Sequence, residues 1–219
     1  MISEEPGAAV PGPKRAAKVG NSSVVSGEDT MRANVYGLLA RLLTAPPSDD
    51  TLEILRSLDV SDDGTEIGQA LVNLSSIASR TTRAQAEDEF TRLFYGLGAG
   101  GEITPTASYY LTGFINEKPL ANLRQDLMEL GIAVSGLNKE PEDHIAFLCE
   151  VMHGMIVGNF SEGVGLIRQK VFFQKHMMPW AMRVFEDLER AEAAVLYMPV
   201  GTVGKFFMDV ESEAFEMAA

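Results

Sequence analysis

Apolar side chains recur every three or four residues along most of the chain, which is the spacing of one face of an α-helix. The stripe from Met31 to Leu43 is typical, and no stretch shows the sustained alternation that would predict a strand. The pattern therefore predicts an all-α protein, a single-domain bundle of about ten helices. The expected helices span residues 26–44, 48–55, 67–78, 82–95, 106–115, 120–130, 141–159, 161–172, 179–198 and 203–210.

Several residues at the borders of these stripes are typical of helix ends. Ser48 can cap the second helix, and Thr82 with Gln85 has the spacing of a capping box. Gly131 closes the helix before it. Pro199 is expected to break the helix that begins near residue 179.

Composition and charge narrow the class of partner. The chain has 219 residues, of which 46% are hydrophobic and 22% are charged, and its formal net charge is −13. An acidic surface repels phosphates, so nucleic acid is not an expected partner, whereas basic segments are. Cys149 is the one cysteine, which fits a reducing compartment. No apolar run reaches the length of a membrane span, so we expect a cytoplasmic protein without stable membrane insertion.

The first 27 residues differ from the rest of the chain. They contain Pro6, Pro11 and Pro13 and the basic residues Lys14 and Arg15, and they lack the apolar core of a signal peptide. We expect residues 1–27 to form a disordered tail and residues 28–219 to form the helical domain.

The stretch Glu140–His144 precedes a strongly apolar helical pattern. With Pro141 at the first helical position, Glu142 and Asp143 would lie in the first turn, where the helix dipole favours negative charge. His144 would then stand beside an acid at the mouth of a buried helix. Spacing alone favours an ordinary acidic helix start with a histidine at the edge of the core, and a functional acid–imidazole pair is the alternative.

Other candidate motifs give weaker indications. Residues 96–101 match G-x-G-x-x-G, but a helix precedes them, so we expect a mobile loop between helices; a GTP-binding switch or hydrolase is the alternative function. Glu150 and His153 form an E-x-x-H without a second copy, so no metal site is expected. Cys149 and His144 lack the arrangement of a nucleophile and base, and no G-x-S-x-G occurs. We expect no enzymatic activity and no cofactor.

Methionines gather around the apolar helix and the helices that follow it. Each one alone is best explained as core, but methionine also lines surfaces that accept varied apolar segments. As a group they suggest a groove for a segment that is both basic and apolar. The residues concerned are Met152, Met155, Met177, Met178 and Met182.

Three motifs in this order resemble the TorD/DmsD/NarJ-type chaperones of molybdoenzymes, over about residues 30–215. The first is FTRLFYGLGAGGEITPTASYY, the second is EPEDHIAFLCEVM with an intact E-P-x-D-H, and the third is FFQKHMMPWAMRVFEDL with His176, Trp180 and Phe185. The second motif is the most specific of the three.

The resemblance implies an all-helical cytoplasmic chaperone without catalytic turnover. Such a protein binds the twin-arginine signal peptide and the precursor of a molybdopterin oxidoreductase, and it delays export until the molybdenum cofactor is inserted. The resemblance also implies a monomer or a domain-swapped dimer. The stretch YYLTGFINEKPLANLR is most similar to members that accompany formate dehydrogenases.

The same resemblance implies where the peptide binds. A twin-arginine peptide has an arginine pair followed by an apolar stretch. Carboxylates form charge-assisted bonds with guanidinium groups, and an apolar groove accepts the remainder. The implied site residues are Leu93, Phe94, Pro105, Ser108, Tyr110, Glu140, Asp143 and His144.

Overall fold

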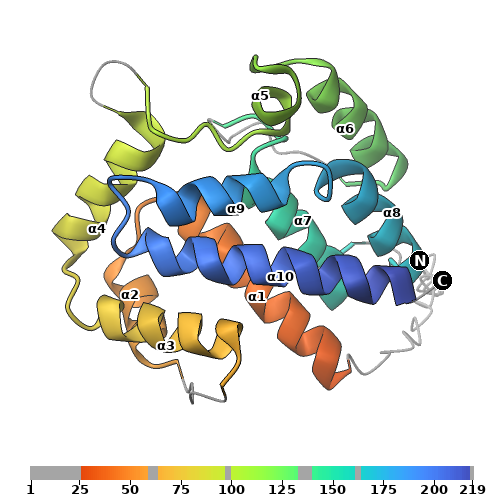
Figure 1. The fold of residues 1–219 in the computed structure, drawn as a ribbon. Coiled ribbons are helices and arrows are strands. Elements are labelled where there is room, and N and C mark those ends of the chain that lie inside the picture. The colour runs from red at the N-terminus through yellow and green to blue at the C-terminus, as the bar shows by residue number, and fades with distance from the viewer. Residues whose placement is uncertain (1–25, 59–63, 97–99, 133–139, 161–163, 218–219) are drawn as a thin grey trace, which may run out of the picture.

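The computed structural model describes residues 26–58, 64–96, 100–132, 140–160 and 164–217. This part of the chain forms ten α-helices and one π-helical turn and contains no strand, which confirms the predicted all-α, single-domain fold (Figure 1). The elements are α1 Gly27–Thr44, α2 Asp49–Arg56, α3 Glu66–Ala78, α4 Arg83–Phe90, η1 Thr91–Tyr95, α5 Ala107–Thr112, α6 Lys118–Glu129, α7 Ile145–Val157, α8 Leu166–His176, α9 Ala181–Arg190 and α10 Tyr197–Met217.

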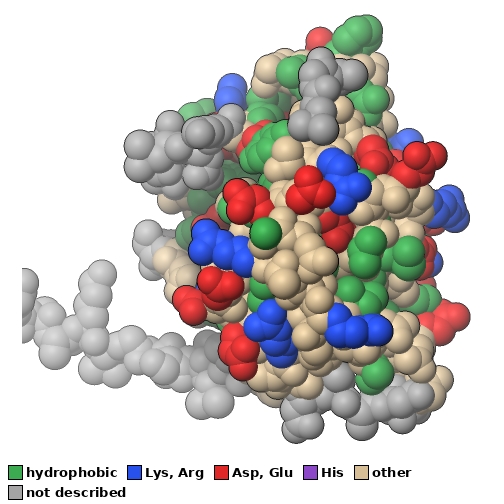
Figure 2. All heavy atoms as spheres, turned by 90° about the vertical axis from the view of Figure 1, so that its left-hand side faces the viewer, with side chains coloured by type: hydrophobic (Ala, Val, Ile, Leu, Met, Phe, Trp, Pro, Cys, Tyr) green, Lys and Arg blue, Asp and Glu red, His purple; other side chains and the backbone are tan. Residues whose placement is uncertain are grey.

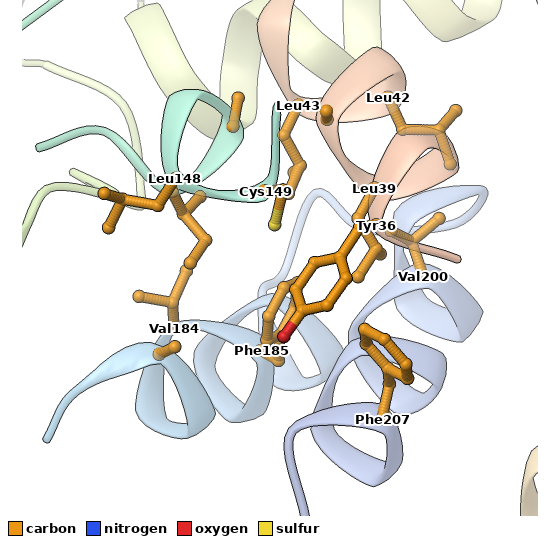
Figure 3. Close-up of a cluster of buried hydrophobic side chains, with 14 of the residues drawn as sticks. Tyr36, Leu39, Leu42, Leu43, Leu148, Cys149, Val184, Phe185, Val200 and Phe207 are labelled. Atoms are coloured by element: carbon orange, nitrogen blue, oxygen red, sulfur yellow. The ribbon is translucent and has the colours of Figure 1, made fainter. Parts of the chain in front are cut away.

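Two pairs of helices enclose the core. α1 packs along α7, and α9 packs along α10, which also contacts α1 and α3 (Figure 1). Figure 3 shows how side chains of all four helices converge, among them Tyr36 from α1, Cys149 from α7, Phe185 from α9 and Phe207 from α10. α7 is the most apolar of the four and is buried on nearly every side, as its sequence predicts.

The predicted helix ends are largely confirmed. The Ser48 side chain accepts a hydrogen bond from the Thr51 backbone N–H at the start of α2. Thr82 and Gln85 form both bonds of a capping box at the start of α4. Gly131 follows the end of α6 with a φ of 69°. Local sequence therefore determines where these helices begin and end.

One prediction about Pro199 is wrong. It was expected to break a helix running from residue 179, but α9 ends at Arg190 and Pro199 lies in the first turn of α10. Val195, assigned to the earlier helix, is exposed in the connection. Proline is tolerated in a first turn because the N–H it lacks would have no partner there.

Other borders also differ, and the last helix, expected over residues 203–210, spans Tyr197–Met217 as α10. The helix predicted for residues 106–115 ends at Thr112, since Gly113 adopts a left-handed φ of 83° that an α-helix does not continue through. α8 begins at Leu166, and the expected start at Ser161 lies outside the described residues, as do residues 1–25 of the expected tail. The first described helix begins at Gly27, with Ser26 as its N-cap.

Within the described residues, no helix combines the length and apolarity that a bilayer crossing requires. The face formed around α4 in Figure 2 shows acidic and basic side chains interspersed, with small hydrophobic areas between them. Neither sign of charge is concentrated on that face.

The connection between α9 and α10 is tied to α4 by a buried carboxylate. Glu89 is 4% exposed, and its two oxygens accept hydrogen bonds from the backbone N–H groups of Val195, Leu196 and Tyr197 at 2.7, 3.1 and 2.8 Å. These N–H groups precede or begin α10, where negative charge is also favoured by the helix dipole.

We expect Glu89→Gln to lower the free energy of unfolding by about 2–3 kcal/mol, because an amide provides one acceptor oxygen where the carboxylate provides two. The matched control is Glu87→Gln on the exposed side of the same helix, which should stay within about 0.5 kcal/mol of the unchanged protein. Urea unfolding of both variants measures the difference. Equal stabilities would contradict a structural role for Glu89.

Candidate functional site

The segments before α5 and α7 pair with each other. The Ala107 N–H donates to the Asp143 carbonyl and the Ile145 N–H donates to the Pro105 carbonyl, both at 2.9 Å. The Asp143 carboxylate strengthens the pairing, since its Oδ2 accepts from the Ser108 N–H at 2.8 Å and from the Ser108 hydroxyl at 2.6 Å. Two motifs about 35 residues apart in the sequence thereby become one structural unit.

This pairing changes the predicted start of the central helix. α7 begins at Ile145 and not at Pro141, so Glu142 and Asp143 lie in a turn before the helix rather than in its first turn. His144 is the N-cap, and its Nδ1 accepts a hydrogen bond from the Ala146 N–H at 3.2 Å. The prediction was wrong because the bridge between Thr106 and His144 keeps the backbone of His144 extended.

The π-helical turn η1 forms the opposite side of the site. η1 closes with a hydrogen bond from the Gly96 N–H to the Thr91 carbonyl at 2.7 Å, the i→i+5 pattern that is frequent at functional sites. The chain then returns along η1, where the Ile103 N–H donates to the Leu93 carbonyl at 2.9 Å. Gly101 permits this close approach, because an added Cβ would collide with the backbone of η1.

Between these two units lies a cavity of about 570 Å³, which we call the α4–α7 cavity. Its walls come from the end of α1, from α4 and η1, from α6 and from the segments before α5 and α7. One part is aromatic and apolar, and another carries carboxylates. The lining residues are Leu43, Thr44, Phe90, Phe94, Tyr95, Thr104, Pro105, Thr106, Ile115, Asn116, Arg124, Glu140, Pro141, Glu142 and His144.

Half of the predicted site residues meet in this cavity. Phe94, Pro105, Glu140 and His144 line it, although they come from three separate stretches of the chain. Phe94 is fixed by ring contacts with Phe90 at 4.7 Å and with Tyr197 at 5.7 Å between ring centroids. Phe90 and Phe94 are thus packed against the core rather than free in solvent.

The other four predicted residues lie behind the wall. Leu93, Ser108 and Asp143 have no exposed surface. Tyr110 turns away to α9, where it packs on Trp180 and its hydroxyl donates to the Asp187 carboxylate at 2.6 Å. Burial, followed by the hydrogen bond to Asp187, raises the pKa of Tyr110 above its usual value. None of these four residues lines the cavity.

Eleven of the fifteen residues that line the cavity were not predicted. Phe90, Tyr95 and Glu142 lie inside the quoted motifs, so their position beside predicted residues was an available signal. Ile115 follows ordinary apolar spacing, and Arg124 carries no sequence signal for this location. Only the tertiary structure brings these side chains together.

The two glutamates of the cavity differ in their partners. The guanidinium of Arg124 donates to Oε2 of Glu142 at 2.7 and 3.0 Å. Burial alone would raise the pKa of Glu142, but the bond from Arg124 leaves it below its usual range. Glu140 is exposed and has no ion pair with any described residue. After burial, the charge of Glu140 is the second cause that raises the pKa of Tyr95.

His144 is a neutral cavity residue at physiological pH. Burial lowers its pKa to about 4, because a charged ring would lose most of its hydration there. Since Nδ1 accepts a hydrogen bond, the neutral ring carries its proton on Nε2. His144 therefore gives the cavity a polar group without positive charge. A positive charge at this position would repel a basic ligand.

The predicted methionine groove is not present. Met152, Met155 and Met177 are buried in the core, at most 1% exposed, so they fill space between helices. Met178 is exposed and Met182 partly so, and neither lines the α4–α7 cavity. The apolar wall of the cavity is aromatic instead.

The remaining motifs lie away from the cavity or partly outside the described residues. Glu150 and His153 line a separate groove beside α1, where His153 Nδ1 lies 2.8 Å from the Ala33 carbonyl. No cluster of three or more acidic, histidine or cysteine side chains suited to a metal occurs among the described residues. Residues 97–99 of the glycine loop lie outside the described part of the chain.

Comparison with known proteins decides the family. The sequence profile of the nitrate reductase delta subunit family matches residues 61–186, a range that includes both units of the cavity. The chain belongs to the TorD/NarJ family of redox-enzyme maturation chaperones. The resemblance drawn from the three motifs is thereby confirmed.

Individual relatives agree with this family. The chain is 24% identical over 200 residues to the chaperone protein TorD of Vibrio parahaemolyticus, covering 83% of this chain and 93% of that protein. It is 30% identical over 139 residues to TorD of Photobacterium profundum, covering 58% and 64%. A solved structure from Archaeoglobus fulgidus, described as a candidate redox enzyme maturation protein, shares the fold with a TM-score of 0.55 at 18% identity, covering 82% of this chain and 94% of that one.

The burial of His144 makes stability depend on pH. Its pKa in the folded chain, about 4, lies below the value of 6.5 for an unburied ring, so the unfolded chain binds the additional proton between these values. The stabilisation is complete above the higher value and decreases as the pH falls towards the lower one. Between about pH 7.5 and about pH 5 we expect a loss of about 2 kcal/mol from this residue.

The test compares the unchanged protein with His144→Asn, since asparagine keeps an N-cap acceptor but does not titrate. Urea unfolding at several pH values should show a shallower decrease for the variant over this range. Parallel pH profiles would show that His144 is not desolvated in the folded state.

Proposed function

We propose that this chaperone binds the twin-arginine signal peptide of a molybdopterin oxidoreductase precursor in the α4–α7 cavity and supports maturation of that enzyme before export, without turnover of its own. The observation that carries this proposal is the composition of the cavity. An unpaired carboxylate and a neutral histidine stand beside an aromatic wall in one space of about 570 Å³. A peptide with basic and apolar parts matches that combination.

The acidic part suits an arginine. Glu140 is exposed at the cavity and forms no ion pair with any described residue, so a guanidinium can form a charge-assisted pair with it. Lysine offers no planar pair of donors, and arginine is preferred where both carboxylate oxygens are reached. The net charge of −13 increases the rate at which a basic segment meets the protein.

The aromatic part suits the apolar stretch that follows the arginine pair. Phe90, Phe94 and Tyr95 form one wall, and Pro105 with Ile115 adds apolar surface from the α5 side. All of these side chains except Ile115 come from helical turns or from the paired segments, so little ordering is needed on binding. Side-chain burial of this kind supplies affinity, whereas the carboxylates supply selectivity.

The client and its compartment follow from the resemblance. Residues 109–124 are most similar to chaperones of formate dehydrogenases, so we propose a formate dehydrogenase precursor as the client, bound in the cytoplasm. A nucleotide-binding switch at residues 96–101 has less support. Helix and turn precede this loop, and the adjoining cavity contains carboxylates that would repel phosphates.

Glu140→Gln should weaken binding of a twin-arginine peptide by at least about fivefold, because it removes the one unpaired carboxylate of the cavity. Glu150→Gln is the matched control: it makes the same change of charge at an exposed residue outside this cavity. Titration calorimetry with the peptide gives both affinities, and a lysine-pair peptide should bind more weakly to the unchanged protein. If no peptide binds saturably while GTP does, the nucleotide alternative replaces this proposal.

Arg124→Gln should instead strengthen binding of the same peptide. Arg124 is about half exposed and holds Glu142 in the manner proposed for a client arginine, so its removal frees a second carboxylate. Exposed ion pairs are worth about 0–1 kcal/mol, which sets the expected gain at about two- to fivefold. Arg168→Gln on the exposed surface of α8 controls for net charge, and an equal gain in that variant would attribute the effect to long-range attraction alone.

A further inference from the structure

A short turn after α5 presents two apolar side chains to solvent. We call residues 113–117 the lip. Phe114 is 70% exposed and Ile115 is 56% exposed, and neither contributes to the core. Gly113 and Asn116 on either side both have left-handed backbones, with φ of 83° and 59°. Asn116 is the one non-glycine residue with positive φ among the described residues, so the turn has a specific and mildly strained shape.

The lip is held by the same pair that joins α5 to α7. The Glu117 N–H donates to the Ser108 hydroxyl oxygen at 3.1 Å, and that hydroxyl donates to Asp143 at 2.6 Å. On the other side, the Phe114 N–H donates to the Thr112 hydroxyl at 3.3 Å. Asp143 has no exposed surface and does not line the α4–α7 cavity, yet its carboxylate holds the Ser108 hydroxyl to which the end of the lip is bonded.

The lip continues the apolar wall of the cavity. Ile115 and Asn116 line the cavity, and Phe114 adjoins them outside it. Tyr95, on the aromatic wall, is also 52% exposed. An apolar segment that leaves the cavity at this edge would therefore stay in contact with apolar side chains.

The carboxylates occupy one part of a cavity of about 570 Å³. If the arginine pair binds there, the apolar stretch of the same peptide would extend along the apolar wall towards its edge. The lip is the exposed apolar surface that adjoins it.

We propose that the lip binds the apolar part of the client segment, and that Asp143 and Ser108 serve the site by positioning the lip rather than by contacting the client. This inference rests on the proposed function. It assigns the two ends of one ligand to two places: the arginine pair to Glu140, and the apolar stretch to Phe114 and Ile115.

The experiment uses two synthetic peptides and the full chain. One peptide carries an arginine pair followed by leucine and alanine, and the other carries the same pair followed by serine and asparagine. Phe114→Ser should weaken the apolar peptide at least about fivefold and leave the polar peptide within about twofold. Ile167→Ser, which removes a similarly exposed apolar side chain from α8, is the control and should change neither affinity.

The outcomes separate the lip from the cavity. If the unchanged protein binds the apolar peptide and Phe114→Ser binds it equally well, the lip proposal is wrong and the proposed function stands. An equal loss for both peptides would also overturn the lip, because it would show a general effect on the cavity. If the unchanged protein binds neither peptide, the proposed function fails and the lip fails with it.

Ser108→Ala tests the positioning role. It removes the hydroxyl that joins the lip to Asp143 but keeps the backbone bond from the Ser108 N–H. The variant should show the same selective loss for the apolar peptide, and it should add little when combined with Phe114→Ser, since both act through one surface. Additive losses, or a loss that affects both peptides alike, would show that Ser108 and Asp143 act otherwise than through the lip.

Discussion

The hydrogen bonds between Asp143 and Ser108 are the constraint on which the site depends. A buried carboxylate is unfavourable unless it is well satisfied, and here one oxygen accepts both the N–H and the hydroxyl of Ser108. The other oxygen has no hydrogen-bond partner among the described residues. Burying this partly satisfied carboxylate costs free energy, but its bonds fix the start of α5 against the start of α7.

Buried acidic residues play this part elsewhere in the molecule too. Glu89 binds the backbone before α10, and Glu211 accepts from both Arg32 and Tyr36 where α10 crosses α1. Burial lowers the pKa of Arg32, whereas the hydrogen bonds to Glu211 raise it. The net result is a pKa above the usual value. In each case a carboxylate joins segments far apart in sequence, so some of the acidic composition is structural and some, as at Glu140, faces solvent.

The cavity combines these rigid supports with groups left free to bind. Phe94 and His144 are fixed by packing and capping, whereas Glu140 and the lip are exposed. This division suits the basic and apolar ligand that we propose. The charge of such a ligand needs an accessible carboxylate, and its apolar part needs surface that does not collapse when the ligand is absent.

The sequence alone determined the helical class, most helix borders and the family, because apolar spacing, caps and short motifs are local properties. Ser48, Thr82 and Gln85 act as their local chemistry predicts. Two of the quoted motifs lie at the cavity, and four of the eight predicted residues line it.

Only the tertiary structure decided which segments pair with each other and which neighbours their side chains face. α7 begins four residues later than its pattern predicts, because His144 is held extended against Thr106 by a contact between distant segments. The methionines face the core, since a helical stripe does not reveal which neighbour will cover it. The place of Arg124 opposite Glu142 likewise depends on how α6 packs, and no local pattern carries that information.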